Sequence, residues 1–449
     1  MRYPALPVIA VAVVLSLLVA APAPPQALVA PDSFGAEPTW SSDQRATASS
    51  AYVVISWNDL GMHCMNETYA DLAVLPPYNT LWAQVVRKGT IPATVTNGVF
   101  VRYSIQDNTY SVGKTDFWTY AKALFGVDLA PNVGLTGATL SGRMKRAADH
   151  FVIEGVPLTP YRDSAPTPGQ QNWYPYQMAQ LVAKDKVSGK VLARTTPVAP
   201  VSTEMHCDNC HYDGAIDGIA TGKVETNILT LHDRDQGTRL MTSRPVLCAG
   251  CHADNALGAP GQPGLPNLSL AMHGWHADVL MGSGPPPAGA GASDGDGPGS
   301  SATSEMERTC YQCHPGLITQ CLRDTMFSEG LTCLDCHGTM ADVADPARRP
   351  WIDLPRCGSC HEAQFAENPG LRYRDSVGHG GMYCEACHGS PHAILPTIQA
   401  NDNLQSIRLQ GHPGTLRDCH VCHGATVPGG LGPHGLRLGI QAPLVAGTP

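Results

Sequence analysis

The chain has 449 residues and a formal net charge of −9, with 15% charged and 6% aromatic residues, 46 glycines and 38 prolines. The length predicts two or three domains, and the glycine and proline content predicts many loops and a weak side-chain core. The acidic balance disfavours nucleic acid as a partner. Beyond the N-terminus no stretch reaches the length of a membrane helix, so we expect no transmembrane segment.

The first 30 residues predict a secretory signal peptide. Arg2 precedes an apolar run from Val8 to Ala21, which is followed by small residues and prolines, the order found in cleavable signals. Residues 31–50 are predicted to be a linker. We therefore expect an exported protein, either periplasmic or extracellular at the cell surface.

Residues 51–203 are predicted to form a β-rich, sandwich-like domain, which contains a single cysteine, Cys64. A short helix is expected over 115–125, with its aromatic side chains turned inward. Strand predictions rest on β-branched and aromatic content and cover 51–57, 80–87, 95–105 and a hairpin of 178–185 with 190–201.

The most informative pattern is the pentapeptide Cys-x-x-Cys-His, which occurs seven times after residue 206. It is the attachment signature of c-type haem. One helical turn places two thiols where they form thioethers to one porphyrin, and the following imidazole then reaches the iron. The predicted attachment cysteines are Cys207, Cys210, Cys248, Cys251, Cys310, Cys313, Cys333, Cys336, Cys357, Cys360, Cys384, Cys387, Cys419 and Cys422. The predicted proximal iron ligands are His211, His252, His314, His337, His361, His388 and His423.

Three other uses of paired cysteines fit this pattern less well. A zinc site needs a second ligand pair and does not require histidine after each cysteine pair, and a disulfide framework does not require it either. A thioredoxin-like centre would show one motif on a βαβ pattern. We therefore predict seven covalently attached haem c groups, carried by a cytochrome c domain over residues 204–437 with short helices and loops around stacked haems. Within it, residues 282–304 predict a mobile low-complexity loop, and residues 438–449 predict a C-terminal tail.

Eleven of the 18 histidines lie outside the proximal positions. A neutral imidazole is the usual second axial ligand of an electron-transfer haem. We assign this distal role to His232, His273, His276, His379, His392, His412 and His434. His63 and His206 are reserves, whereas His150 is predicted to be structural and His420 to lie at the surface. Methionine at one iron remains an alternative.

Two cysteines, Cys64 and Cys321, lie outside the motifs. In an exported protein they either form a disulfide between the two halves of the chain or remain two separate buried thiols. The sequence leaves both possibilities open.

Three segments carry a resemblance to a known family. Trp57–Cys64 (WNDLGMHC), Glu204–Cys207 (EMHC) and Cys384–His392 (CEACHGSPH) resemble exported bacterial multihaem c-type cytochromes. The likeness extends over about residues 51 to 437. It implies an electron conduit in respiratory or extracellular electron transfer, which ends on metal oxides, other cytochromes or soluble acceptors.

These patterns favour an electron carrier without catalytic residues. Every motif ends in histidine, and the spare histidines outnumber the seven irons. One alternative is a multihaem oxidoreductase of a small nitrogen or sulfur oxyanion with one open haem. Another is a subunit of a filament that assembles through haem stacking.

Overall fold

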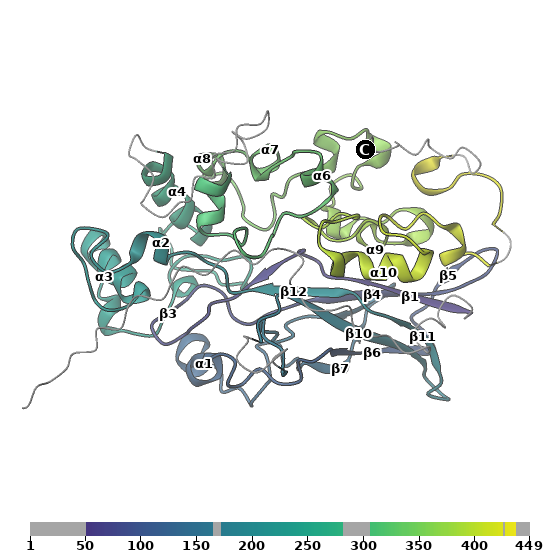
Figure 1. Ribbon diagram of the computed structural model, residues 1–449, viewed down its shortest axis with the longest axis horizontal. Coiled ribbons are helices and arrows are strands. Elements are labelled where there is room, and N and C mark those ends of the chain that lie inside the picture. Colours follow the sequence, from purple (N-terminus) through teal and green to yellow (C-terminus); the bar gives the residue numbers. More distant parts are fainter. Residues whose placement is uncertain (1–50, 165–171, 282–305, 425–426, 437–449) are drawn as a thin grey trace, which may run out of the picture.

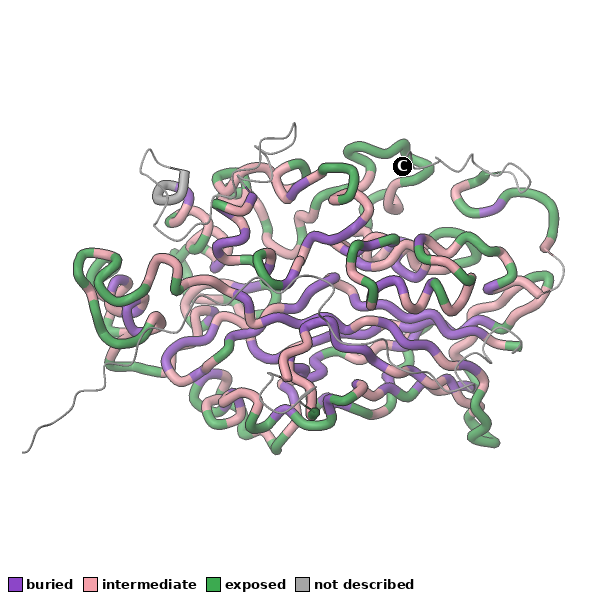
Figure 2. Tube along the Cα trace, viewed as in Figure 1, coloured by how far each residue is buried: buried purple, intermediate pink, exposed green. Residues whose placement is uncertain are grey.

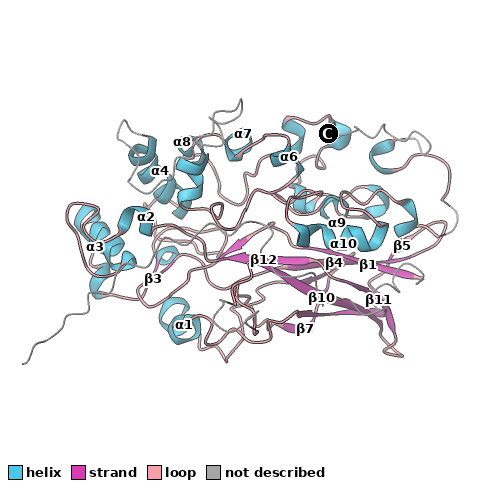
Figure 3. Ribbon diagram, viewed as in Figure 1, coloured by secondary structure: helices cyan, strands magenta, loops and turns pink. Residues whose placement is uncertain are grey.

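The computed structural model describes residues 51–164, 172–281, 306–424 and 427–436 (Figure 1). The predicted signal peptide, linker, low-complexity loop and C-terminal tail lie outside these described residues. The remainder divides into a β-rich N-terminal region and a later region of short helices and loops (Figure 3).

Two β-sheets form the N-terminal region. The first contains, in spatial order, β1 (Tyr52–Trp57), β4 (Leu81–Arg87), β9 (Phe151–Ile153) and β8 (Lys145–Arg146), with β5 (Ala93–Thr94) also paired to β4. The second contains β2 (His63–Cys64), β12 (Val198–Ser202), β10 (Tyr176–Asp185), β6 (Val99–Ile105) and β7 (Ser141–Arg143), with β11 (Val191–Thr195) also paired to β10. Apolar side chains of both sheets share one core, including Val54 and Val85 from the first and Val101 and Leu181 from the second.

Most predicted strands are confirmed, with two corrections. β1 and β4 occupy the predicted ranges, but β6 begins at Val99 instead of residue 95 because Gly98 has a φ of +73° and turns the chain. The predicted hairpin is present as β10 and β11. Its second strand is interrupted before Val198, where Pro197 has no N–H to donate, and it resumes as β12 along the same partner, β10.

The predicted short helix is confirmed as α1 (Phe117–Phe125), which ends at Gly126 in the left-handed conformation. Phe117 is fully buried, and Trp118, Tyr120 and Phe125 pack against the shared core. Alternating or aromatic-rich sequence patterns therefore predicted the longer strands and α1 correctly. The short strands β2, β7, β8 and β9 were not predicted, because two or three residues carry no readable periodicity.

Short helices separated by loops make up the later region. They are α2 (Asp208–His211), α3 (Val224–Gln236), α4 (Leu268–Met281), α6 (Thr325–Ser328), α7 (Cys333–His337), α8 (Met340–Val343), α9 (Cys384–His388) and α10 (Ala400–Gln410). One strand of this region, β13 (Val246–Leu247), pairs in parallel with β3 (Leu72–Ala73) and joins the two regions.

Buried residues concentrate in the sheets, whereas the later region is mostly half-buried or exposed (Figure 2). Its largest separate apolar cluster contains only Met306, Tyr311 and Leu322 as buried members. The later region extends along the long axis of the molecule, from α3 and α2 at one end to the segment after α10 at the other (Figure 1). Side chains alone therefore give this region little core.

The segment Trp57–Cys64 forms a close contact with the loop after α9. The Asn58 side-chain oxygen accepts hydrogen bonds from the backbone N–H groups of Leu60 and Gly61, at 3.1 and 2.9 Å. Gly61 has a φ of +77°, and a Cβ there would lie 1.9 Å from the carbonyl oxygen of Pro391. Only glycine permits this approach, which holds the loop that carries His392.

Candidate cofactor-binding site

Each Cys-x-x-Cys-His motif forms one helical turn. In the first, third, fifth and seventh motifs in chain order, the histidine N–H donates to the carbonyl of the first cysteine at 2.8 Å, and in the second motif at 3.0 Å. The fourth and sixth motifs are the helices α7 and α9. One turn therefore separates the two thiols in all seven motifs, and the imidazole follows directly.

Six of the seven motif histidines face a second histidine from elsewhere in the chain. The ring centroids are separated by 6.3 Å in His211–His276, 6.4 Å in His252–His232, 6.0 Å in His314–His273, 6.0 Å in His337–His392, 5.7 Å in His388–His434 and 6.1 Å in His423–His379. Two imidazoles bound at about 2 Å to opposite sides of one metal ion would have centroids about 6 Å apart. The observed separations match this requirement.

In several of these pairs, the ring nitrogen that points away from the partner has a hydrogen-bond acceptor. Nδ1 of His252 lies 2.9 Å from the Pro266 carbonyl, and Nδ1 of His423 lies 3.0 Å from that of Thr90. Nδ1 of His434 is likewise 2.9 Å from the Gln364 carbonyl. A hydrogen bond donated from Nδ1 leaves the Nε2 lone pair available to a metal. In the sixth motif the two Nε2 atoms, of His388 and His434, face each other at 3.5 Å.

Helix α4 supplies two of the facing histidines. Nδ1 of His273 lies 2.8 Å from the Ser269 carbonyl and Nδ1 of His276 lies 2.7 Å from that of Met272, each one turn back on the same helix. His273 then faces His314 of the third motif, and His276 faces His211 of the first. One helix thus completes two pairs.

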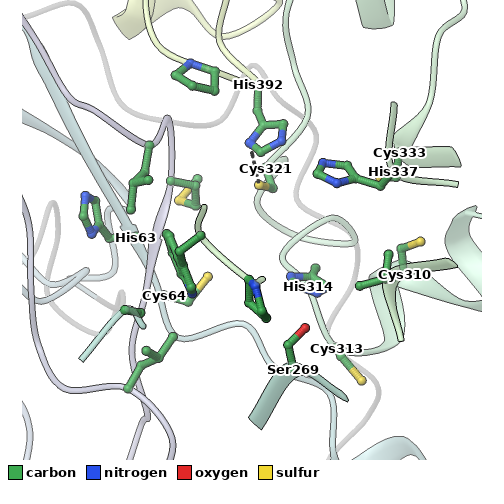
Figure 4. Close-up of a pocket in the computed structure, with 18 of the residues that line it drawn as sticks. His63, Cys64, Ser269, Cys310, Cys313, His314, Cys321, Cys333, His337 and His392 are labelled. Atoms are coloured by element: carbon green, nitrogen blue, oxygen red, sulfur yellow. Dashed lines mark hydrogen bonds between the residues drawn. The ribbon is translucent and has the colours of Figure 1, made fainter. Parts of the chain in front are cut away.

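Two of the facing histidines have unusual backbone conformations. His392 has a φ of +64° and His434 a φ of +58°. This left-handed region is uncommon for a residue other than glycine, and such conformations gather at functional sites. Figure 4 shows the outcome for His392, which lies beside His337 although the two come from separate segments.

Burial keeps several of the paired imidazoles neutral. It lowers the pKa of His211, His314 and His337 to about 4, and the facing histidine lowers each pKa further. A neutral imidazole is the form that binds a metal. These three side chains are therefore in the binding form at neutral pH.

Several motifs surround one large cavity of about 2420 Å³ (Figure 4). An ordinary small-molecule pocket holds about 300–1,000 Å³, so this one has room for more than one large group. Cysteines of the first, third, fourth and fifth motifs line it. Burial raises the pKa of Cys207 to about 11 and that of Cys313 to about 12. A thioether has no proton to lose and is better suited than a thiolate to such surroundings.

Thiols of different motifs lie close enough to raise one another's pKa, and burial is the larger cause at each of the affected thiols except Cys333. Cys207 acts on Cys248 and on Cys313, which links the second motif to the first and the first to the third. A hydrogen bond between Cys333 and Cys310 connects the fourth motif to the third. The remaining neighbours raise the pKa of a cysteine in the adjacent motif: Cys360 that of Cys336, Cys384 that of Cys357, and Cys422 that of Cys387. The motifs therefore follow one another in space in the order 2–1–3–4–5–6–7.

His361 of the fifth motif differs from the other motif histidines. It is exposed, and among the described residues no imidazole is in ring contact with it. His412, which we assigned a distal role, has its Nδ1 2.9 Å from the Pro413 carbonyl and faces no motif histidine within the described part of the chain. Its distal role stays a prediction.

The other histidines outside the motifs have different partners. His150 stacks on Trp82 with centroids 4.3 Å apart, which fits a structural role, and His420 is exposed beside Asp418. The reserve histidines lie beside carboxylates, and only His206 is hydrogen-bonded to one. Nε2 of His206 lies 3.0 Å from Glu204, and Nε2 of His63 lies 3.4 Å from Asp59.

Neither Cys64 nor Cys321 is in a disulfide. Burial is the main reason that the Cys64 pKa is raised, and Cys321 adds to it, so the two thiols lie near each other. The Cys321 sulfur is 3.9 Å from Nδ1 of His392. Sequence reasoning missed this contact, because nothing local to Cys321 indicates a partner 71 positions further along the chain.

Within the described ranges, no three His, Cys, Asp or Glu side chains gather as a protein-bound metal ion would require. A haem iron needs only two protein ligands, because the porphyrin supplies the other four donors. The six histidine pairs and the cysteines beside them fit that group. None of the helices in these ranges has the length and apolar character needed to cross a bilayer. Searches against protein-family models, curated proteins and solved structures find no match to the chain.

Proposed function

We propose that the protein is an exported heptahaem c-type cytochrome of the multihaem electron-transfer type, and that it carries electrons in respiratory or extracellular electron transfer. One observation carries the proposal: six motif histidines each face a second histidine at 5.7–6.4 Å. Seven attachment motifs without such pairs would support haem binding alone. The pairs favour low-spin irons with two histidine ligands, which suit electron transfer.

The spatial order of the motifs favours the conduction of electrons along the molecule rather than their storage at separate sites. The second and seventh motifs are the two ends of this order, and each remaining motif has a neighbour on either side. The later region follows the long axis of the molecule (Figure 1). Electrons entering at one end would therefore leave at the other, toward redox partners such as other cytochromes or extracellular acceptors.

The polypeptide's own contribution is to hold and orient the ligands. Bound haem supplies a reversible one-electron iron couple. The carbonyl groups of Ser269, Met272 and Pro266 fix the ring orientation of three histidines, and burial keeps His314 neutral. Fixed ligands limit the rearrangement that accompanies each change of iron charge.

The direct test is the intact mass of the mature protein after denaturation, because thioether-linked haem survives unfolding. The mass should exceed that of the processed polypeptide by seven haems. A count of five or fewer would contradict the proposal for the later region. The N-terminal sequence of the same sample would locate the signal cleavage and test export.

An assay of substrate turnover distinguishes an electron carrier from an enzyme. The reduced protein should be oxidised rapidly by a soluble ferric chelate and should not turn over nitrite, hydroxylamine, sulfite or tetrathionate. Steady-state turnover of one of these compounds would favour the multihaem oxidoreductase. One observation keeps that second candidate open, namely the lack of a facing imidazole at His361 within the described residues.

A further inference from the structure

All 18 histidines of the chain lie within the described residues. Twelve of them make the six pairs, and His361 is the one motif histidine left without a facing imidazole in this part of the chain. A histidine on the opposite side of the same iron would lie about 6 Å away. The other six motifs meet that condition and the fifth does not.

The five histidines outside the motifs and pairs have other neighbours than His361 among the described residues. His150 is stacked on Trp82, and His420 is exposed beside Asp418. His206 is bound to Glu204, which raises its pKa and so favours the protonated form that cannot bind a metal. His63 is buried with its Nε2 3.4 Å from Asp59, and it lines the same cavity as His361 without facing it. The Nδ1 of His412 lies 2.9 Å from the carbonyl of Pro413 in its own loop. None is in ring contact with His361 among the described residues.

We infer that the fifth motif, Cys357–Cys360–His361, holds a haem with one axial position left to an exchangeable small ligand. This inference rests on the proposed function. The ligand class is the small molecules and anions that bind haem iron directly, with carbon monoxide as the ferrous probe and cyanide as the ferric probe. Cys357, Cys360 and His361 all line the large cavity, which has room for a small ligand beside a haem.

The position of the fifth motif gives the site a defined role. The fifth motif lies between the fourth and the sixth. Its cysteines line the same cavity as those of the fourth, and the Gln364 carbonyl just after it lies 2.9 Å from Nδ1 of His434, which faces His388 of the sixth. A ligand bound there would act on a haem in the middle of the order, not at either end. Electron flow between the two ends would then respond to that ligand.

The test begins with the unmodified haem-loaded protein. The oxidised form should show a high-spin electron paramagnetic resonance signal from one of seven haems. After reduction with dithionite, it should bind one carbon monoxide per seven haems. Seven haems that are all low-spin and inert to carbon monoxide would overturn the inference and leave the proposed function intact, whereas a low haem mass would contradict the proposed function itself.

Two motif deletions locate the site. Replacing Cys357, Cys360 and His361 with alanine should give a six-haem protein that no longer binds carbon monoxide. The matched control removes Cys419, Cys422 and His423, which form a similar 3-10 turn but have His379 opposite. That control should also lose one haem mass and keep its carbon monoxide site. Undiminished binding after loss of the fifth motif would overturn the assignment.

His412 provides an arm that does not depend on removing a haem. His412→Ala should leave the high-spin signal and the carbon monoxide stoichiometry of the parent unchanged. If the parent bound no carbon monoxide and the variant gained one site, His412 would be the sixth ligand, as the sequence predicts, and the inference would be wrong. His63→Ala makes the same test of the buried reserve histidine in the same cavity.

Discussion

At the scale of single residues, Glu204 fixes the segment that follows the third motif. Its buried carboxylate accepts hydrogen bonds from the backbone N–H groups of Leu317, Ile318 and Thr319 at 2.7, 2.9 and 2.6 Å. Burial alone would raise the Glu204 pKa, but hydrogen bonds from His206 and Thr319 outweigh it and lower the pKa to about 2. The ionised carboxylate therefore stabilises the fold.

Replacing Glu204 with glutamine should lower the free energy of unfolding by about 3 kcal/mol at neutral pH, at roughly 1.4 kcal/mol per pKa unit. A lowered pKa contributes stability that is present above the unfolded value of 4.5 and is lost as the pH falls toward 2. The parent should lose this stability in acid and the variant should not. Denaturant unfolding followed by circular dichroism at several pH values measures both. The exposed Glu329→Gln is the control, and an equal effect of both variants would contradict the prediction.

The histidine pairs also make predictions at this scale. His392→Ala should convert one additional haem to high spin, because His337 would lose its facing imidazole. His420→Ala, at an exposed histidine outside the pairs, should leave the spectrum unchanged. Electron paramagnetic resonance of the oxidised proteins counts the high-spin haems. A spectrum of the His392 variant identical to that of the parent would show that His392 is not a ligand.

At the scale of elements, α10 is tied to the segment after the third motif by a fully buried ion pair. The Arg323 Nε and Nη2 atoms donate to the Asp402 carboxylate at 2.6 and 3.0 Å. Arg323 also donates to the carbonyls of Gln320 and Cys321, and Thr397 donates to Asp402. The guanidinium nitrogens of Arg323 and the carboxylate of Asp402 therefore all have hydrogen-bond partners, which a buried ion pair requires.

Removing one member of this pair should cost about 3–5 kcal/mol, because the other charge is left buried and uncompensated. Arg323→Leu and Asp402→Leu should each show this loss of unfolding free energy, and the double variant should lose less than the sum of the two. The exposed pair Arg349–Asp353 is the matched control, and its replacement should change the free energy of unfolding far less, because solvent screens exposed charges. Additive losses in the double variant would show that the two residues are not coupled.

At the scale of the whole molecule, the two regions differ in what holds them together. The large apolar core belongs to the sheets and α1, whereas the later region lines most of a cavity of about 2420 Å³ that it shares with the N-terminal region. Under the proposed function, haem groups supply the apolar surface that the side chains of the later region lack.

Protein made without haem attachment should therefore be cleaved first in the later region. The physical reason is that this region could not bury enough apolar surface to offset its conformational entropy. Limited proteolysis with mass spectrometry should map the early cuts after residue 203 in the haem-free protein. The haem-loaded protein, treated in parallel, should resist at the same positions. Equal resistance of the two forms would contradict a stabilising role of haem.

The sequence alone was sufficient for features that depend on neighbouring residues. Each Cys-x-x-Cys-His motif is contiguous, so its single helical turn follows from local hydrogen bonding. The same holds for β1, β4, the β10–β11 hairpin and α1, whose side-chain patterns repeat over several residues. The abundance of histidines between the motifs also indicated where facing partners would be found.

Only the tertiary structure decided which histidine faces which motif and in what order the motifs lie. His392 follows the sixth motif in the sequence but faces His337 of the fourth, and the first motif lies between the second and the third. Nothing in the sequence distinguished His361 from the other motif histidines. Such pairings depend on loops that close over long separations, and the packing that fixes a closed loop involves residues far from it in the sequence.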